Sequence, residues 1–102
     1  MAEEARKAGL WGAAQFGPGK NYMVGWSKII YYLDGLWTAW PVADYLQLIG
    51  YARRNKVDYL VEELVGPESM SEPTKPPYGL ELAGLYRSET SQYAAVFYRL
   101  IP

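Results

Sequence analysis

Apolar residues recur at helical spacing near the start of the chain. Between residues 2 and 15 they follow one another every three or four positions, which is typical of a helix with one apolar side. Acidic residues precede basic ones in the first two turns, an order that the helix dipole favours. The segment is predicted to be a helix that stops at Gly17-Pro18-Gly19. Its apolar positions are Ala5, Ala8, Trp11 (or Leu10 in its place) and Ala14.

A second segment with helical periodicity carries its own start signal. Asp44 can cap the first turn, and Gln47 three residues later completes the pattern of a capping box. Two arginines stand in the last turn, where positive charge is favoured. We expect a helix over residues 44–54. Its apolar side consists of Tyr45, Leu48, Ile49 and Ala52.

Short apolar runs bounded by turn residues predict strands between and after these helices. They occupy residues 22–24, 36–40, 57–61, 85–87 and 93–100. The polar residues 88–92 separate the last two runs by a distance that predicts a hairpin.

Three further segments are read from their start and stop signals. Residues 26–33 are interpreted as a short helix, because Ser27 can cap its start and Asp34-Gly35 can follow its end. Residues 66–77 are rich in proline and are expected to form a long irregular loop. Residues 78–83 are expected to form a short amphipathic turn after that loop.

The order of these elements describes a single domain of the α/β class. Helices alternate with the first three strands, which predicts parallel pairing, and the last two strands follow one another directly. The 102 residues suffice for one independent core. We therefore expect a small three-layer domain, with a short parallel sheet, flanking helices and a C-terminal antiparallel hairpin.

Composition removes most kinds of catalytic site. The chain has no His and no Cys, which excludes an imidazole base, a thiol nucleophile, a disulfide and the usual zinc sites. Ten Lys and Arg against eleven Asp and Glu leave a net charge of -1, and the basic residues near Arg53 form no dense patch. Nucleic acid is therefore not an expected partner. We expect no catalytic residue, no metal site and no cofactor in this chain.

Two acidic residues lie where α/β sheets place ligand sites. Glu62 and Glu63 follow a predicted parallel strand at its carboxyl end. Such a pair could bind Mg²⁺ or act as an acid and a base, but neighbouring strand residues point to opposite faces of a sheet. Solvated carboxylates at the start of a loop are the favoured interpretation.

The tryptophans are the side chains best suited to binding. An exposed indole can stack on a sugar ring, although packing in the core is the favoured interpretation for any one aromatic residue in so small a domain. Trp37 and Trp40 flank a strand end beside Pro41 and are the first candidates. The full set of candidate ligand-binding residues is Trp26, Trp37, Trp40, Glu62 and Glu63.

Read in order, several short segments resemble a known arrangement. They are Ala8-Gly9-Leu10-Trp11, Gly17-Pro18-Gly19, Met23-Val24-Gly25-Trp26, Ile30-Tyr31-Tyr32-Leu33-Asp34-Gly35, Trp40-Pro41, Asp44-Tyr45, Tyr51-Ala52-Arg53, Val57-Asp58-Tyr59-Leu60-Val61 and Val96-Phe97-Tyr98-Arg99-Leu100. From about Glu4 to Leu100, their order resembles the soluble C-terminal domain of prokaryotic polytopic membrane glycosyltransferases. The type is that of the dolichyl-phosphate-mannose–protein mannosyltransferases and the lipid A aminoarabinose transferases.

The resemblance implies an accessory, non-catalytic role. The parent enzyme, in the cell membrane, would transfer a sugar from a polyprenyl-phosphate carrier to protein or lipid, with its catalytic carboxylate in the membrane portion. Residues 1–102 would be its soluble, non-catalytic C-terminal domain on the extracytoplasmic side, without membrane insertion. Its partners would be the membrane portion of the parent chain and a glycan or acceptor. A stand-alone module that binds a sugar or nucleotide, and a structural or interaction domain, stay open as alternatives.

Overall fold

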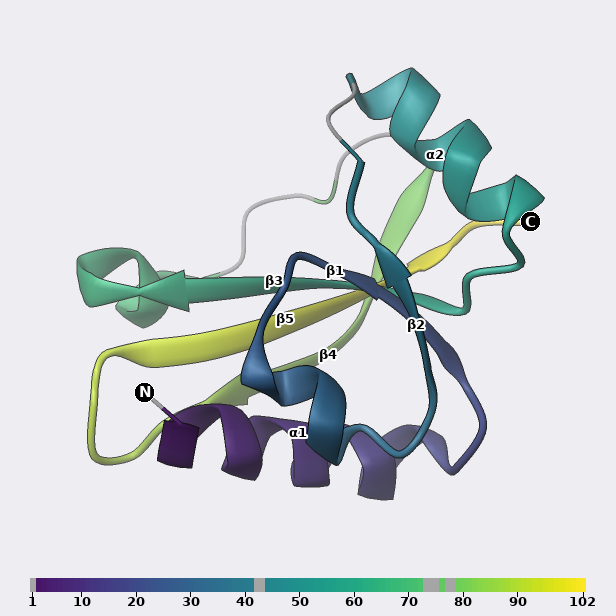
Figure 1. The fold of residues 1–102 in the computed structure, drawn as a ribbon. Helices are drawn as coiled ribbons and strands as arrows, with labels where there is room; N and C mark the ends of the chain where they lie inside the picture. Colours follow the sequence, from purple (N-terminus) through teal and green to yellow (C-terminus); the bar gives the residue numbers. More distant parts are fainter. Residues whose placement is uncertain (1, 42–43, 73–75, 77–78) are drawn as a thin grey trace.

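The computed structural model describes residues 2–41, 44–72, 76 and 79–102. Its elements, with η for a short 3-10 helix, are α1 (Ala2–Phe16), β1 (Asn21–Val24), η1 (Lys28–Tyr32), β2 (Leu36–Ala39), α2 (Tyr45–Arg54), β3 (Tyr59–Val65), η2 (Gly66–Met70), β4 (Leu80–Arg87) and β5 (Tyr93–Leu100). The sheet lies between α1 and η1 on one face and α2 on the other, which makes three layers (Figure 1).

The five strands form one mixed sheet in the order β2-β1-β3-β5-β4. β1 pairs in parallel with β2 and with β3, whereas β5 pairs antiparallel with β3 and with β4. The chain turns between β4 and β5 at residues 88–92, as predicted. The expected α/β class, with parallel strands, flanking helices and a C-terminal antiparallel hairpin, is confirmed.

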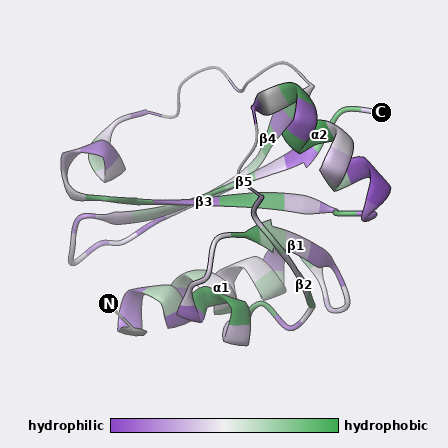
Figure 2. Cartoon of the chain, turned by 45° about the horizontal axis from the view of Figure 1, so that its top comes forward, coloured by the Kyte–Doolittle hydropathy of each residue, from purple (hydrophilic) through white to green (hydrophobic). Residues whose placement is uncertain are grey.

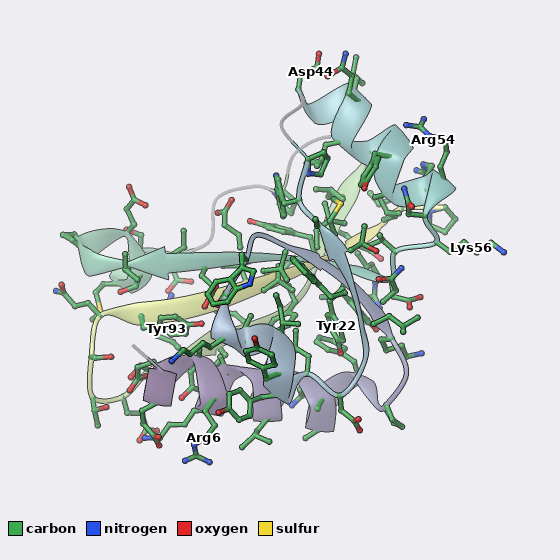
Figure 3. The ribbon with its side chains drawn as sticks, in the orientation of Figure 1. Arg6, Tyr22, Asp44, Arg54, Lys56 and Tyr93 are labelled. Atoms are coloured by element: carbon green, nitrogen blue, oxygen red, sulfur yellow. The ribbon has the colours of Figure 1, made fainter. Side chains whose placement is uncertain are left out.

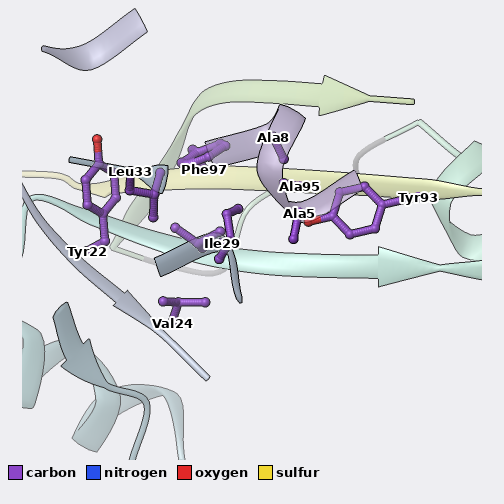
Figure 4. Packing of buried hydrophobic residues seen from close by; sticks show 10 residues of the cluster. Ala5, Ala8, Tyr22, Val24, Ile29, Leu33, Tyr93, Ala95 and Phe97 are labelled. Atoms are coloured by element: carbon purple, nitrogen blue, oxygen red, sulfur yellow. The ribbon is translucent and has the colours of Figure 1, made fainter. Parts of the chain in front are cut away.

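The face covered by α1 buries aromatic rings among aliphatic side chains (Figure 4). Phe97 is fully buried there, with ring centroids 5.7 Å from Trp11 and 5.3 Å from Phe16. Helix α1 approaches η1 closely because Gly9 has no side chain: a Cβ added there would lie 2.6 Å from the Cβ of Tyr32. Since each buried ring removes about 150–250 Å² from water, this face contributes much of the hydrophobic stabilisation.

One end of the opposite face is covered by α2, along which hydrophobic and hydrophilic residues alternate (Figure 2). Asp44 caps this helix as predicted, because its carboxylate accepts a hydrogen bond of 2.9 Å from the backbone N–H of Gln47. Leu48 and Ala52 are buried in the same cluster as Leu60 of β3. Neither α1 nor α2, nor any other helix in the described residues, has the length and apolar character needed to cross a membrane.

Some predicted boundaries are wrong. Ser27 caps η1 as expected, but the helix is a single 3-10 segment. Of the expected turn over residues 78–83, residues 80–83 are instead the start of β4, and residue 78 lies outside the described part. A bulge between Leu82 and Gly84 shifts the register and hides the strand alternation. The expected loop over residues 66–77 begins with η2, and its residues 73–75 and 77 are also outside the described part.

Candidate functional site

The carboxyl end of β1 lies beside the middle of β3, which continues to Val65. Glu62 and Glu63 therefore lie within β3, and the prediction that they follow the strand is wrong, because β3 is prolonged by its pairing with β5. The chain leaves the two strands in opposite directions. From β1 it continues through η1 to β2 on one side, and from β3 it continues into η2 on the other. In α/β sheets, a divergence of this kind opens a crevice in which ligands bind. We therefore take this point of the sheet as the candidate site.

A cavity of about 270 Å³ occupies the crevice. Its wall combines the end of β1 and the following loop with the residue after β2 and the middle of β3. Of the five candidate residues, Trp26, Trp40, Glu62 and Glu63 line it together. The remaining lining residues are Val24, Gly25 and Val61.

The tryptophans differ in what they contact. The side chain of Trp26 is 70% exposed, whereas Trp40 is half-buried and packs against the cluster beneath α2. Trp37 does not line the cavity: its indole N–H donates a 2.8 Å hydrogen bond to the backbone oxygen of Val24, which ties β2 to the end of β1. Trp11 has a role in core packing, because its ring contacts three other rings. The exposed side chain of Trp26 has no such role.

The two glutamates point to opposite faces of β3, as the sequence suggests. Glu63 accepts a short hydrogen bond from the hydroxyl of Tyr93, which is buried beside α1 (Figures 3 and 4). Burial, together with this bond to Glu63, raises the pKa of Tyr93 well above its usual range. Glu62 is exposed and pairs in register with Val96, which belongs to the cluster beneath α2. Both carboxylates reach the cavity because it lies around the edge of β3.

The cavity contains negative charge and no cation. None of its described lining residues is Lys or Arg, and the ion pairs Arg6–Glu3 and Arg99–Glu81 lie on other parts of the described chain. Two carboxylates repel a phosphate, so a nucleotide fits poorly. The described residues also hold no cluster of three or more His, Cys, Asp or Glu side chains that could bind a metal ion. A hydroxyl-rich or cationic group between the indoles and the carboxylates is the better fit.

Glu62 also lines a second cavity, of about 260 Å³, on the α2 face. Its floor includes Leu64, and its edge includes Arg87, whose guanidinium donates to the backbone oxygens of Ser69 at 3.1 Å and Ser71 at 2.8 Å. This cavity is not predicted from the sequence, because it forms only where η2, β4 and β5 meet. A charged residue at the end of the apolar strand β4 is the signal that could have pointed to it.

No protein family matches the chain, and neither the curated proteins nor the solved structures include a significant match. The function therefore has to be inferred from the site itself.

Proposed function

We propose that the chain is a non-catalytic binding domain that holds a sugar-bearing ligand in the crevice between β1 and β3. The observation that carries the proposal is the convergence of Trp26, Trp40 and Glu62 on one cavity. The faces of the indoles provide flat apolar surfaces for the C–H groups of a sugar ring, and the carboxylate accepts hydrogen bonds from its hydroxyl groups. A few polar groups in a mainly apolar cavity are typical of sites for small ligands.

The arrangement of the carboxylates supports a binding role over catalysis. Glu62 and Glu63 lie on opposite faces of β3, so they do not form a convergent acid and base pair. Glu63 is also engaged by the Tyr93 hydroxyl. If the isolated chain transferred or hydrolysed a glycosidic bond, this part of the proposal would be wrong.

We also propose that this domain is the extracytoplasmic accessory domain of a membrane glycosyltransferase that uses a polyprenyl-phosphate sugar. Support comes from the order of the sequence segments from Glu4 to Leu100 and from a crevice suited to a glycan or a glycosylated acceptor. Crosslinking in membranes of the native organism provides a test, because the proposal expects adducts with membrane-embedded segments of a glycosyltransferase. Adducts with soluble proteins alone would contradict it.

A titration followed by amide NMR tests the binding site. Monosaccharides and disaccharides should shift the signals of Gly25, Trp26 and the middle of β3. The variant Trp26→Ala should weaken this binding by about tenfold, because a stacking surface is lost. Tyr31→Ala is the matched control, since Tyr31 is 71% exposed, close to the 70% of Trp26, but does not line the cavity. Equal losses in both variants, or shifts far from the crevice, would overturn the proposal.

A further inference from the structure

Strand β3 continues past the end of its neighbour β1. It pairs with β5 from Tyr59 to Val65, but with β1 only at Tyr59 and Leu60. Within the described part of the chain, no strand pairs with the other edge of β3 after Leu60. The cavity lined by Trp26 and Trp40 lies against this open edge, because Val61 and Glu63 are also in its wall.

The backbone of the open edge is oriented for a further strand. The N–H of Gly66 donates to the backbone oxygen of Gln92, just beyond the end of β5, at 3.0 Å. In an antiparallel pair, alternate residues direct both backbone groups toward the partner, so Leu64 and Glu62 share the orientation of Gly66. Glu63 and Val65 consequently direct their N–H and C=O groups away from β5, toward the open edge.

The side chains along this edge favour one kind of partner. Glu62 and Glu63 project to opposite faces, and neither forms an ion pair with the described residues. A strand added here would place consecutive side chains next to these two carboxylates, one on each face. Lysine or arginine at those positions would be attracted, whereas a second copy of β3 would set glutamate beside glutamate and be repelled.

We propose that the open edge of β3 binds an extended basic peptide as an added strand. The peptide would lie next to β3, beyond the end of β1. The peptide carries two consecutive Lys or Arg residues, which meet Glu62 and Glu63, and its backbone bonds to Glu63 and Val65. Trp26 and Trp40 offer apolar surface to the aliphatic parts of those side chains. Strand addition of this kind takes affinity from backbone hydrogen bonds and specificity from alternate side chains. The inference concerns the same crevice as the proposed sugar site but does not depend on sugar binding.

The test uses the full chain and the short peptide Thr-Val-Lys-Lys-Val-Thr, followed by amide NMR. The signals of Glu63 and Val65 should shift, and Thr-Val-Glu-Glu-Val-Thr should bind about tenfold more weakly or not at all. In an extended peptide, alternate residues direct their backbone N–H groups to the same edge. Methylation of the backbone nitrogens on the edge that faces β3 should abolish binding of the Lys-Lys peptide, whereas methylation on the opposite edge should not. Loss on neither side would mean that charge alone attracts the peptide, and would overturn strand addition.

Reversing the charge of Glu62 provides a second test of the strand site. Glu62→Lys should weaken binding of the Lys-Lys peptide by about tenfold and improve binding of the Glu-Glu peptide. Glu89→Lys is the control, because Glu89 is exposed in the β4–β5 connection, does not line this cavity, and makes the same change of net charge. If both variants lose the same affinity, or if basic and acidic peptides bind equally, the proposal is wrong. The glutamates would then serve only to keep the edge from pairing.

Sugar titrations on the same samples separate the two proposals. Peptide binding without sugar binding would remove the proposed sugar site and leave the strand site intact. Sugar binding without peptide binding would do the reverse.

Discussion

The two faces of the sheet are built differently, although both are covered by a helix. On the α1 face, aromatic rings such as Phe97 and Tyr22 fill the space between helix and sheet, and glycines in α1 bring η1 close. On the other face, α2 lies over one end of the sheet, and a cavity of about 260 Å³ lies over β3 and β5 next to η2. One face is therefore closed by close packing, and the other keeps space beside Glu62.

Two consecutive glutamates show what the difference means. Glu63, directed to the α1 face, is held by the hydroxyl of the buried Tyr93. Glu62, directed to the α2 face, is exposed, forms no ion pair within the described chain, and lines both cavities. Two residues of the same type therefore differ in their contacts: Glu63 is held by a buried hydroxyl, whereas Glu62 is open to a ligand on the other face. Substitutions on the α1 face should mainly change stability, and those beside Glu62 should mainly change binding.

The largest contrast is expected between Phe97→Ala and Leu64→Ala. Phe97 is completely buried among rings, so its truncation should lower the free energy of unfolding by about 3–5 kcal/mol. Leu64 is half-buried in the floor of the open cavity, and its truncation should cost about 1–2 kcal/mol. Urea denaturation of both variants gives the comparison. Equal costs would show that the α2 face is packed as closely as the other.

Replacing one glycine of α1 and one glycine of α2 by alanine should change the stability of the fold in opposite directions. Gly9→Ala in α1 would place a Cβ 2.6 Å from the Cβ of Tyr32, and should destabilise the fold by about 1–3 kcal/mol despite the helix propensity of alanine. Gly50→Ala in α2 meets only the flexible end of Arg54, at 3.4 Å, and should stabilise the fold by about 0.5–1 kcal/mol. Thermal unfolding of the two variants measures the signs, and a stabilising Gly9→Ala would contradict close packing of α1 on η1.

Much of this fold follows from local sequence patterns. The cap at Asp44, the stop at Gly17-Pro18-Gly19 and the 88–92 connection each depend on residues within a few positions, so they could be predicted. The start of β4 could not, because the bulge at Gly84 breaks the alternation and the strand is defined by its pairing with β5. Pairing across the sheet is not encoded by any short window of the chain.

The candidate site could be predicted to a similar extent. The rule that ligand groups gather at strand ends points to Glu62 and the tryptophans, and the cavity does bring Glu62 together with Trp26 and Trp40. The strand end itself is predicted wrongly, because β3 continues through Glu62 to Val65. The ties of Trp37 to Val24 and of Glu63 to Tyr93 could not be foreseen, because they join residues 13 and 30 positions apart. The open edge of β3 was hidden for the same reason: it depends on where β1 stops pairing.

The smallest predicted effects are those of pH on stability through the two buried tyrosines of the α1 face. Burial, with smaller contributions from nearby Tyr59, Asp58 and Asp34, raises the pKa of Tyr22 to about 12. An unfolded chain would ionise this tyrosine near pH 10, so above that pH the unfolded state releases a proton that the folded state keeps. Below pH 10, Tyr22 should therefore not make the free energy of unfolding depend on pH. Above pH 10, the free energy of unfolding should fall as the pH rises toward 12.

Two phenylalanine variants separate this effect from the hydrogen bond to Glu63. The hydroxyl of Tyr22 is buried without a hydrogen-bond partner among the described residues, so Tyr22→Phe should be neutral or stabilising by up to about 1 kcal/mol at pH 7. It should also flatten the loss above pH 10. Tyr93→Phe should likewise flatten the alkaline loss, but should cost about 1–2 kcal/mol at pH 7 because Glu63 loses its donor. Glu62→Gln, on the open face, should leave the urea midpoint unchanged at pH 7. A cost for Glu62→Gln equal to that of Tyr93→Phe would mean that both faces hold their carboxylates alike, and the contrast between them would fail.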